Sequence, residues 1–66
     1  MQITLNDRTL DITDTATLAA VLAEHVRMYG HMAVAINDRV IPRSTYADVR
    51  LSDGDHVEVV QAVGGG

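Results

Sequence analysis

A chain of 66 residues forms one domain of modest stability, since a chain of this size buries only about 60 % of its unfolded surface. The net charge of -4 argues against a nucleic-acid or anionic-membrane partner, because both need a basic face. The absence of cysteine excludes disulfides, thiolate metal sites and sulfur chemistry on a cysteine side chain. We also expect no signal peptide and no membrane span, and therefore a cytoplasmic location.

The first two predicted elements are strands joined by a turn. Ile3 and Leu5 alternate with polar residues, which is the period-two pattern of a half-buried strand, and Leu10 and Ile12 repeat it. The residues between the two patterns, 6–8, have the Asn-Asp composition of a turn. The N-terminal part of the sequence therefore predicts a hairpin.

The next segment predicts a helix. Asp14, Thr15 or Thr17 can cap its start by accepting hydrogen bonds from free N–H groups, and we favour Thr17. Four apolar residues recur at the spacing that places them on one helical face: Leu18, Val21, Leu22 and Val26. We expect the helix to end at Gly30.

The second half of the sequence predicts three more strands. Residues 33–36 form one, and the turn 37–39 leads into the short strand 40–41, which Pro42 ends because proline has no N–H for a ladder bond. Three segments follow, namely an irregular or single-turn helical connection (44–49), a turn (53–55) and the last strand (57–63).

This order of elements predicts the fold. A hairpin alone is not stable in water, so the helix must cover one face of a single mixed sheet, with the first and last strands as neighbours in its middle. Two hairpin-like pairs around one main helix are the α+β β-grasp, or ubiquitin-like, fold. We expect residues 1–63 to form this domain and residues 64–66 to form a flexible tail.

The three histidines are candidate metal ligands. His25, His31 and His56 lack the i, i+4 spacing of a helical zinc pair, and no cysteine can assist them, so no metal site is predicted. No base at motif spacing accompanies the hydroxyl groups of residues 44–46, so nucleophilic catalysis is not predicted either.

The last strand predicts a surface for a partner. Because a strand alternates sides, Val57 and Val59 fit the core and their neighbours face away from the helix. Four small apolar residues are then expected on the uncovered face, namely Val60, Ala62, Ala33 and Ala35. Scattered exposed apolar residues are common, but a contiguous patch beside the tail is better interpreted as a docking surface.

The tail itself is Gly64, Gly65 and Gly66. Glycine has no Cβ, so such a tail can thread a narrow channel, and its last carbonyl can be approached from any side. We expect Gly66 to carry a terminal carboxylate that becomes a reactive acyl donor once AMP is attached to it. The alternative is a frayed terminus without a role.

Four segments, in this order, resemble the ThiS family of bacterial sulfur carrier proteins of thiamine biosynthesis: AVAIND (33–38), VIPR (40–43), DGD (53–55) and VVQAVGGG (59–66). The resemblance extends over residues 1–66. Gly64 stands where members of that family often have alanine or serine.

The resemblance implies that the protein is a cosubstrate and not an enzyme. A ThiF-type adenylating enzyme would use ATP to join AMP to Gly66, and a persulfide from a cysteine desulfurase or sulfurtransferase would displace the AMP. The resulting Gly66 thiocarboxylate would donate its sulfur to thiazole synthase. The carrier would hold no permanent cofactor and would be a monomer when alone.

Other interpretations remain open. The small subunit of molybdopterin synthase shares this chemistry, a ubiquitin-like modifier would join its terminus to a lysine, and a β-grasp binding module would use no tail chemistry. Arg43 and Arg50 can pair with acids on a partner or can simply keep the protein soluble.

Overall fold

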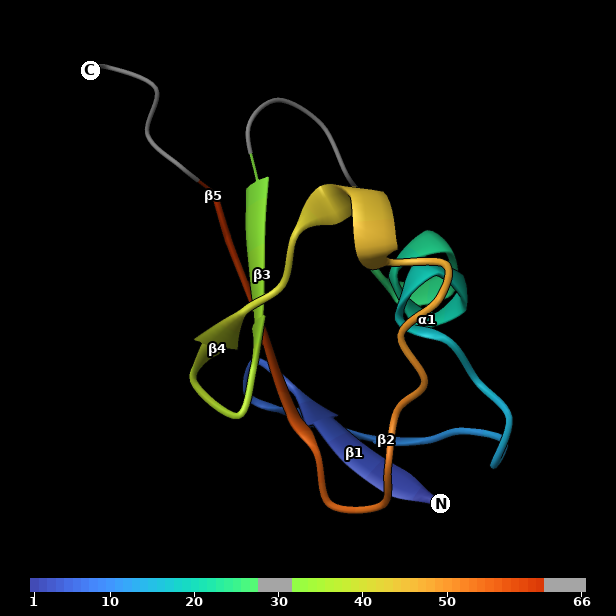
Figure 1. Ribbon diagram of the computed structural model, residues 1–66. Helices are drawn as coiled ribbons and strands as arrows, with labels where there is room; N and C mark the ends of the chain where they lie inside the picture. Colours follow the sequence, from blue (N-terminus) through green and yellow to red (C-terminus); the bar gives the residue numbers. More distant parts are fainter. Residues whose placement is uncertain (28–31, 62–66) are drawn as a thin grey trace, which may run out of the picture.

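The computed structural model describes residues 1–27 and 32–61, and these form five strands, one α-helix and one short 3-10 helix (Figure 1). The elements are β1 (Gln2–Leu5), β2 (Arg8–Asp11), α1 (Leu18–His25), β3 (Met32–Ile36), β4 (Arg39–Val40), η1 (Arg43–Thr45) and β5 (His56–Gln61). The predicted order of elements is confirmed. The part of the last strand expected beyond Gln61 lies outside the described residues.

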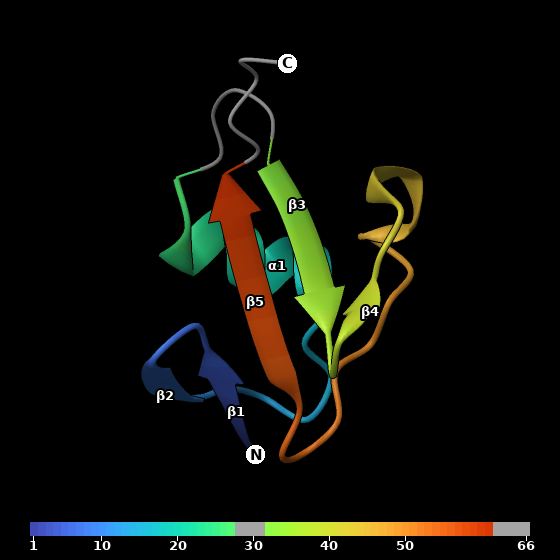
Figure 2. The ribbon, with the colours of Figure 1, turned by 90° about the vertical axis from the view of Figure 1, so that its left-hand side faces the viewer.

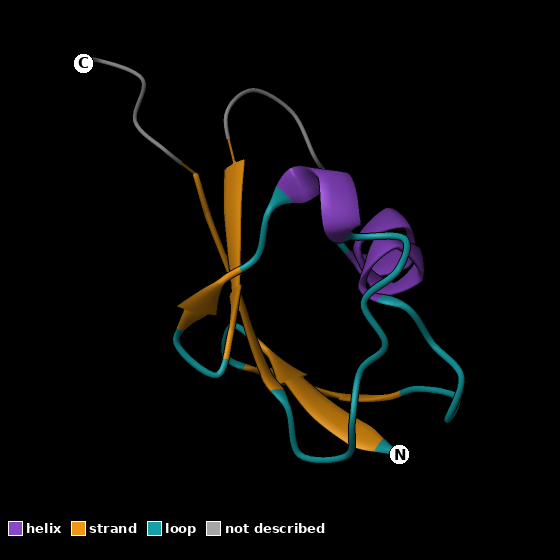
Figure 3. Cartoon of the chain, viewed as in Figure 1, coloured by secondary structure: helices purple, strands orange, loops and turns teal. Residues whose placement is uncertain are grey.

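The strands form one mixed sheet in the order β2-β1-β5-β3-β4 (Figure 2). β1 and β5 run parallel in the middle, and the other neighbouring pairs are antiparallel. The predicted adjacency of the first and last strands is therefore confirmed. Both helical elements lie on one side of the sheet, so the other side has no helix over it in the described residues (Figure 3).

The hairpin turns use residues that tolerate a left-handed backbone. Asn37 and Asp38, between β3 and β4, have φ angles of 51° and 69°, the pattern of a type I′ two-residue turn. Asn6, between β1 and β2, has a φ of 54°. Because Asn and Asp adopt this conformation more easily than most side chains, these positions fix the strand register.

The helix begins as predicted and ends earlier. The Thr17 hydroxyl accepts a hydrogen bond from the Ala20 N–H at 3.2 Å, which confirms Thr17 as the N-cap. The prediction of Gly30 as the helix end is wrong, because α1 ends at His25 and Val26 is already extended, with φ −126° and ψ 132°. Val26 packs against the core from this extended position, and a β-branched residue gives up little by leaving a helix. Gly30 lies outside the described residues.

The core lies between α1 and the covered side of the sheet. Its buried residues come from β1, β2, α1, β3 and β5 and from the connection before β5: Ile3, Leu5, Leu10, Leu18, Val21, Leu22, Val34, Leu51, Val57 and Val59. The predicted helix face is confirmed, with Val26 only partly buried. Leu51 was not predicted, and its burial is secured by its N–H, which donates to the Ala16 carbonyl at 3.2 Å. In the part of the chain described, no helix is long and apolar enough to span a membrane.

Candidate functional site

The side of the sheet opposite α1 is the candidate docking surface, and we call it the open face. It includes seven residues that alternate with core positions or pair across strands with such residues: Thr4, Ala33, Ala35, Val40, His56, Glu58 and Val60. Val60 lies directly opposite Ala33, and Ala35 lies between Glu58 and Val40. The alternation along β3 and β5, together with the pairing of these two strands, thus brings three of the four predicted patch residues onto one surface.

The exposure of this surface differs sharply from that of the core side. Val60 is 55 % exposed and Val40 is 71 % exposed, whereas Ala33 and Ala35 are half-buried between them. We call these four residues the apolar patch. Ala62 lies outside the described residues, and so do Gly64, Gly65 and Gly66. The role of these positions in binding and chemistry stays a prediction.

Val40 was not among the predicted patch residues. The sequence places it in a short strand but does not show how that strand is paired. The type I′ turn sets Val40 opposite Ala35, so that its side chain shares the open face. The Asn-Asp pair was the available signal, because a two-residue turn fixes which side of the hairpin each residue occupies.

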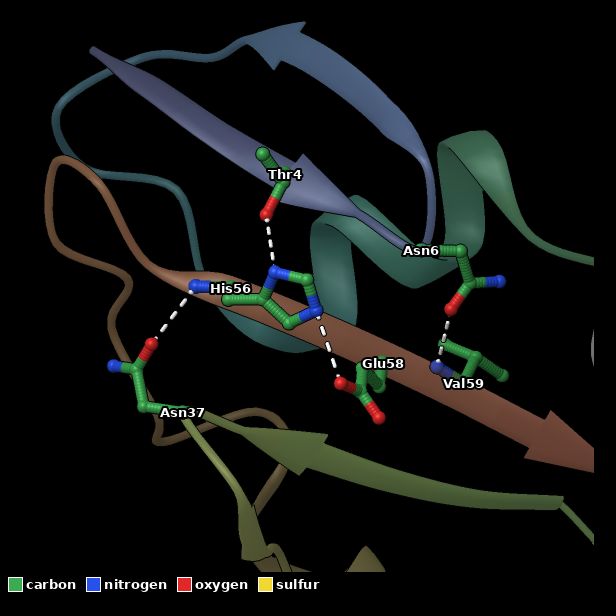
Figure 4. Close-up of polar contacts among 6 residues, drawn as sticks. All are labelled: Thr4, Asn6, Asn37, His56, Glu58 and Val59. Atoms are coloured by element: carbon green, nitrogen blue, oxygen red, sulfur yellow. Dashed lines mark hydrogen bonds and ion pairs between the residues drawn. The ribbon is translucent and has the colours of Figure 1, made fainter.

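A polar cluster occupies the other end of the open face (Figure 4). The His56 ring joins two neighbours, with Nδ1 2.9 Å from Thr4 Oγ1 and Nε2 3.0 Å from Glu58 Oε1. The sequence predicted no partner for His56. The i, i+2 spacing of His56 and Glu58 on one strand was the signal that would have found their contact. The cluster fixes the orientation of two ionisable side chains beside the apolar patch.

Two asparagines hold β5 in place. β1 pairs with β5 at only two positions, and beyond them the Asn6 side-chain oxygen accepts a hydrogen bond from the Val59 N–H at 2.8 Å (Figure 4). On the other side of β5, the Asn37 side-chain oxygen accepts from the His56 N–H at 2.9 Å. These contacts replace ladder bonds that the short neighbouring strands do not supply. The position of β5 along its two neighbouring strands is therefore fixed from both sides.

Metal-binding groups do not gather in the described residues. Within that part of the chain, no three His, Cys, Asp or Glu side chains lie close enough to hold an ion. His25 Nε2 lies 4.0 Å from Glu24 Oε2, and the His56 ring contacts Thr4 and Glu58 as described above. His31 lies outside the described residues.

A single mixed sheet of this strand order, with one main helix across it, is the β-grasp fold, as the sequence predicted. The family model of the ThiS family matches residues 1–66. The chain belongs to the ThiS family. The predicted resemblance is confirmed.

Individual relatives agree with this assignment. The sulfur carrier protein ThiS of Escherichia coli is 30 % identical over the whole length of both chains. The thiazole synthase of Paramagnetospirillum magneticum is 33 % identical over 66 residues, and the chain spans 20 % of the length of that protein. These likenesses support a role for the chain in thiamine biosynthesis.

Two solved structures of a thiamine biosynthesis protein (ThiS) from Geobacter metallireducens have the same fold. The crystal structure matches with a TM-score of 0.84 at 26 % identity, and all of both chains is covered. The NMR structure matches with a TM-score of 0.71 at 29 % identity, over all of this chain and 88 % of the other. The likeness to the β-grasp fold of these structures therefore extends over the whole chain.

Proposed function

We propose that this protein is the sulfur carrier for thiazole formation in thiamine biosynthesis, with the Gly66 carboxylate as the group that carries sulfur. The observation that carries the proposal is the full-length likeness to a sulfur carrier protein, in a sequence where three glycines follow the last strand. The chain has no cysteine, so a sulfur atom must travel on another group. Residues 1–63 would act as the domain and residues 64–66 as its tail.

The chemistry follows from the weakness of a carboxylate as an electrophile. An oxygen of the Gly66 carboxylate attacks the α-phosphorus of ATP on the adenylating enzyme, and pyrophosphate leaves. A persulfide sulfur from a cysteine desulfurase or sulfurtransferase then attacks the acyl carbon, and AMP leaves. A thiol then attacks the donor's sulfur in the resulting acyl disulfide, which forms a new disulfide with the donor and releases the Gly66 thiocarboxylate. We place these steps in the cytoplasm.

A domain of 66 residues is too small to build an ATP site of its own beside a core, so the carrier and the adenylating enzyme have different roles. The adenylating enzyme supplies the ATP site and the positive groups that stabilise charge on the phosphates. The carrier supplies a tail without side chains and a surface that fixes how far the tail reaches. The apolar patch suits this role, because Val60 lies near the end of the described part of β5 and the two asparagines hold that strand.

Thiazole synthase is the proposed acceptor of the sulfur. The protein of that name from Paramagnetospirillum magneticum contains a segment similar to this whole chain. When a carrier-like segment and a synthase occur in one polypeptide, the two act in one place, so the likeness supports a direct transfer between them. We propose that the synthase docks on the same apolar patch as the adenylating enzyme.

The proposal is tested by intact mass spectrometry of the purified carrier. The carrier is incubated with a ThiF-type adenylating enzyme, ATP and a persulfide donor. Replacement of one carboxylate oxygen by sulfur is the expected mass change, and thiazole synthase with its substrates should reverse it. Conjugates of higher mass would instead indicate a protein modifier, and no mass change would contradict the proposal.

The competing carrier function is separated genetically. Deletion of the gene should create a requirement for thiamine that the wild-type chain restores. A requirement for molybdopterin without one for thiamine would indicate the small subunit of molybdopterin synthase instead.

A further inference from the structure

A depression of about 390 Å³ lies at the β4 edge of the sheet. Its walls combine apolar and charged side chains from separate parts of the chain: Ile36, Arg39, Ile41, Val49, Arg50 and Asp55. Ile36 shares the core-facing side of β3 with Val34, and Arg39 pairs with Ile36. The depression is therefore distinct from the apolar patch. In Figure 2 the segment leading from η1 toward β5 descends beside β4, where this edge lies.

The charge of this edge is opposite to that of the whole protein. The net charge is -4, with nine acidic residues against five arginines. The lining of the depression has two arginines, Arg39 and Arg50, against one acid, Asp55, so it carries a small net positive charge. The folded chain thus presents a local positive region on an acidic molecule, which favours an acidic partner at this edge.

The two arginines of the depression have no partner within the described residues. Neither Arg39 nor Arg50 forms a side-chain hydrogen bond or ion pair with any residue in 1–27 or 32–61. Asp55, in the same depression, accepts instead from the Asn37 side-chain amide at 3.0 Å and from the Ser52 N–H at 2.8 Å. Each guanidinium therefore keeps its five donors for a ligand.

We propose that this depression docks an extended acidic segment of the adenylating enzyme, and the proposal rests on the function proposed above. Carboxylates of the segment pair with Arg39 and Arg50 in bidentate fashion, and an apolar side chain between them covers Ile41 and Val49. A compact anion such as phosphate fits less well. It would gain nothing from the apolar walls.

The consequence of this arrangement is faster encounter with the enzyme. Opposite charges on the two proteins orient them before contact, and the apolar patch then fixes the tail in the ATP site. The depression would therefore contribute to association and not to the chemical step. The Michaelis constant for the carrier should depend on it, while the turnover number should not.

The test compares two double charge reversals in the pyrophosphate-release assay with the adenylating enzyme. Arg39→Glu with Arg50→Glu should raise the Michaelis constant about tenfold or more at low ionic strength, with the turnover number unchanged. The control, Arg8→Glu with Arg27→Glu, makes the same change in net charge with one substitution on β2, at the opposite edge of the sheet. It should change the constant less than twofold (about the scatter expected of a surface substitution).

The dependence of the Michaelis constant on salt concentration is an independent test of the charge interaction. The difference between wild type and the Arg39/Arg50 variant should shrink at about 1 M salt, because the Debye length falls to roughly 3 Å. A thermal melt checks that each variant folds, and Arg39→Gln with Arg50→Gln replaces the glutamate variant if that one does not. Equal effects of the two pairs, or no effect of the Arg39/Arg50 pair, would overturn the proposal. Wild-type carrier that releases no pyrophosphate would overturn the sulfur-carrier function and this inference together.

Discussion

The two sides of β5 differ sharply in the exposure of their side chains. Val57 and Val59 face α1 and are 0 % and 9 % exposed, whereas Val60 faces the other way and is 55 % exposed. The side toward the helix has the tight packing of a small core. The open face keeps an apolar patch and a polar cluster without a helix over them. One strand therefore stabilises the domain with one set of residues and can present the tail to a partner with the other.

The largest effect should come from the core side. Leu22→Ala removes a buried side chain of α1 and should lower the free energy of unfolding by about 2–5 kcal/mol, a large part of what a small domain has. Chemical denaturation measures the change. The matched control is Glu24→Ala on the exposed side of the same helix, which should stay within about 0.5 kcal/mol of wild type. Equal shifts in the two variants would show that the helix face is assigned wrongly.

The asparagine contacts that join β5 to its neighbours should have the next largest effect. Asn6→Gly keeps the left-handed backbone possible but removes the acceptor for the Val59 N–H, and should cost about 1–2 kcal/mol. Hydrogen exchange at Val59 is the sharper measurement, since its amide loses its hydrogen-bond partner. Asp7→Gly, in the same turn, is the control. Unchanged protection of the Val59 amide in Asn6→Gly would contradict the proposed role of Asn6.

The open face should respond in binding and not in stability. Val60→Asp places a carboxylate against an apolar partner surface and should weaken binding to the adenylating enzyme and to thiazole synthase by about tenfold, roughly 1.4 kcal/mol. The thermal melt should stay close to that of wild type. Titration calorimetry and a melt on the same variant decide the outcome.

Val59→Asp is the matched control for that variant, one residue away on the opposite side of β5. It buries a charge in the core and should lower the melting temperature strongly. If Val60→Asp binds both partners as wild type does, Val60 is not part of the interface. If Val60→Asp unfolds the protein, the separation of the two sides of β5 is wrong.

Much of this architecture could be predicted from the sequence, because the patterns that set it are local. The alternation around Ile3, Leu5 and Val57 and the helical spacing around Leu22 each depend on nearby residues. Leu51 could not be found in this way, because its alternation with Val49 extends over only three residues, too few to predict an element. Its burial depends on a long-range contact with the segment before α1.

The candidate site was predictable where strand alternation decides it and less so where pairing does. Val60 and Ala33 follow from period two alone. Val40 and the Thr4–His56 contact depend on which residue of one strand lies opposite which residue of another. A turn sets that register for Val40, whereas β1 and β5 are parallel and no turn joins them. The early end of α1 could not be predicted from the helical spacing, because Val26 keeps that spacing and yet has an extended backbone and packs against the core.

The central claim, that Gly66 is the reacting group, is tested most directly by changing the tail by one residue. Deleting Gly66, or adding one residue after it, alters the reach of the tail without touching a described element of the fold. A displacement of this size at the reacting atoms should abolish pyrophosphate release with the adenylating enzyme, while the circular dichroism spectrum stays that of wild type. Full activity of either variant would contradict the account.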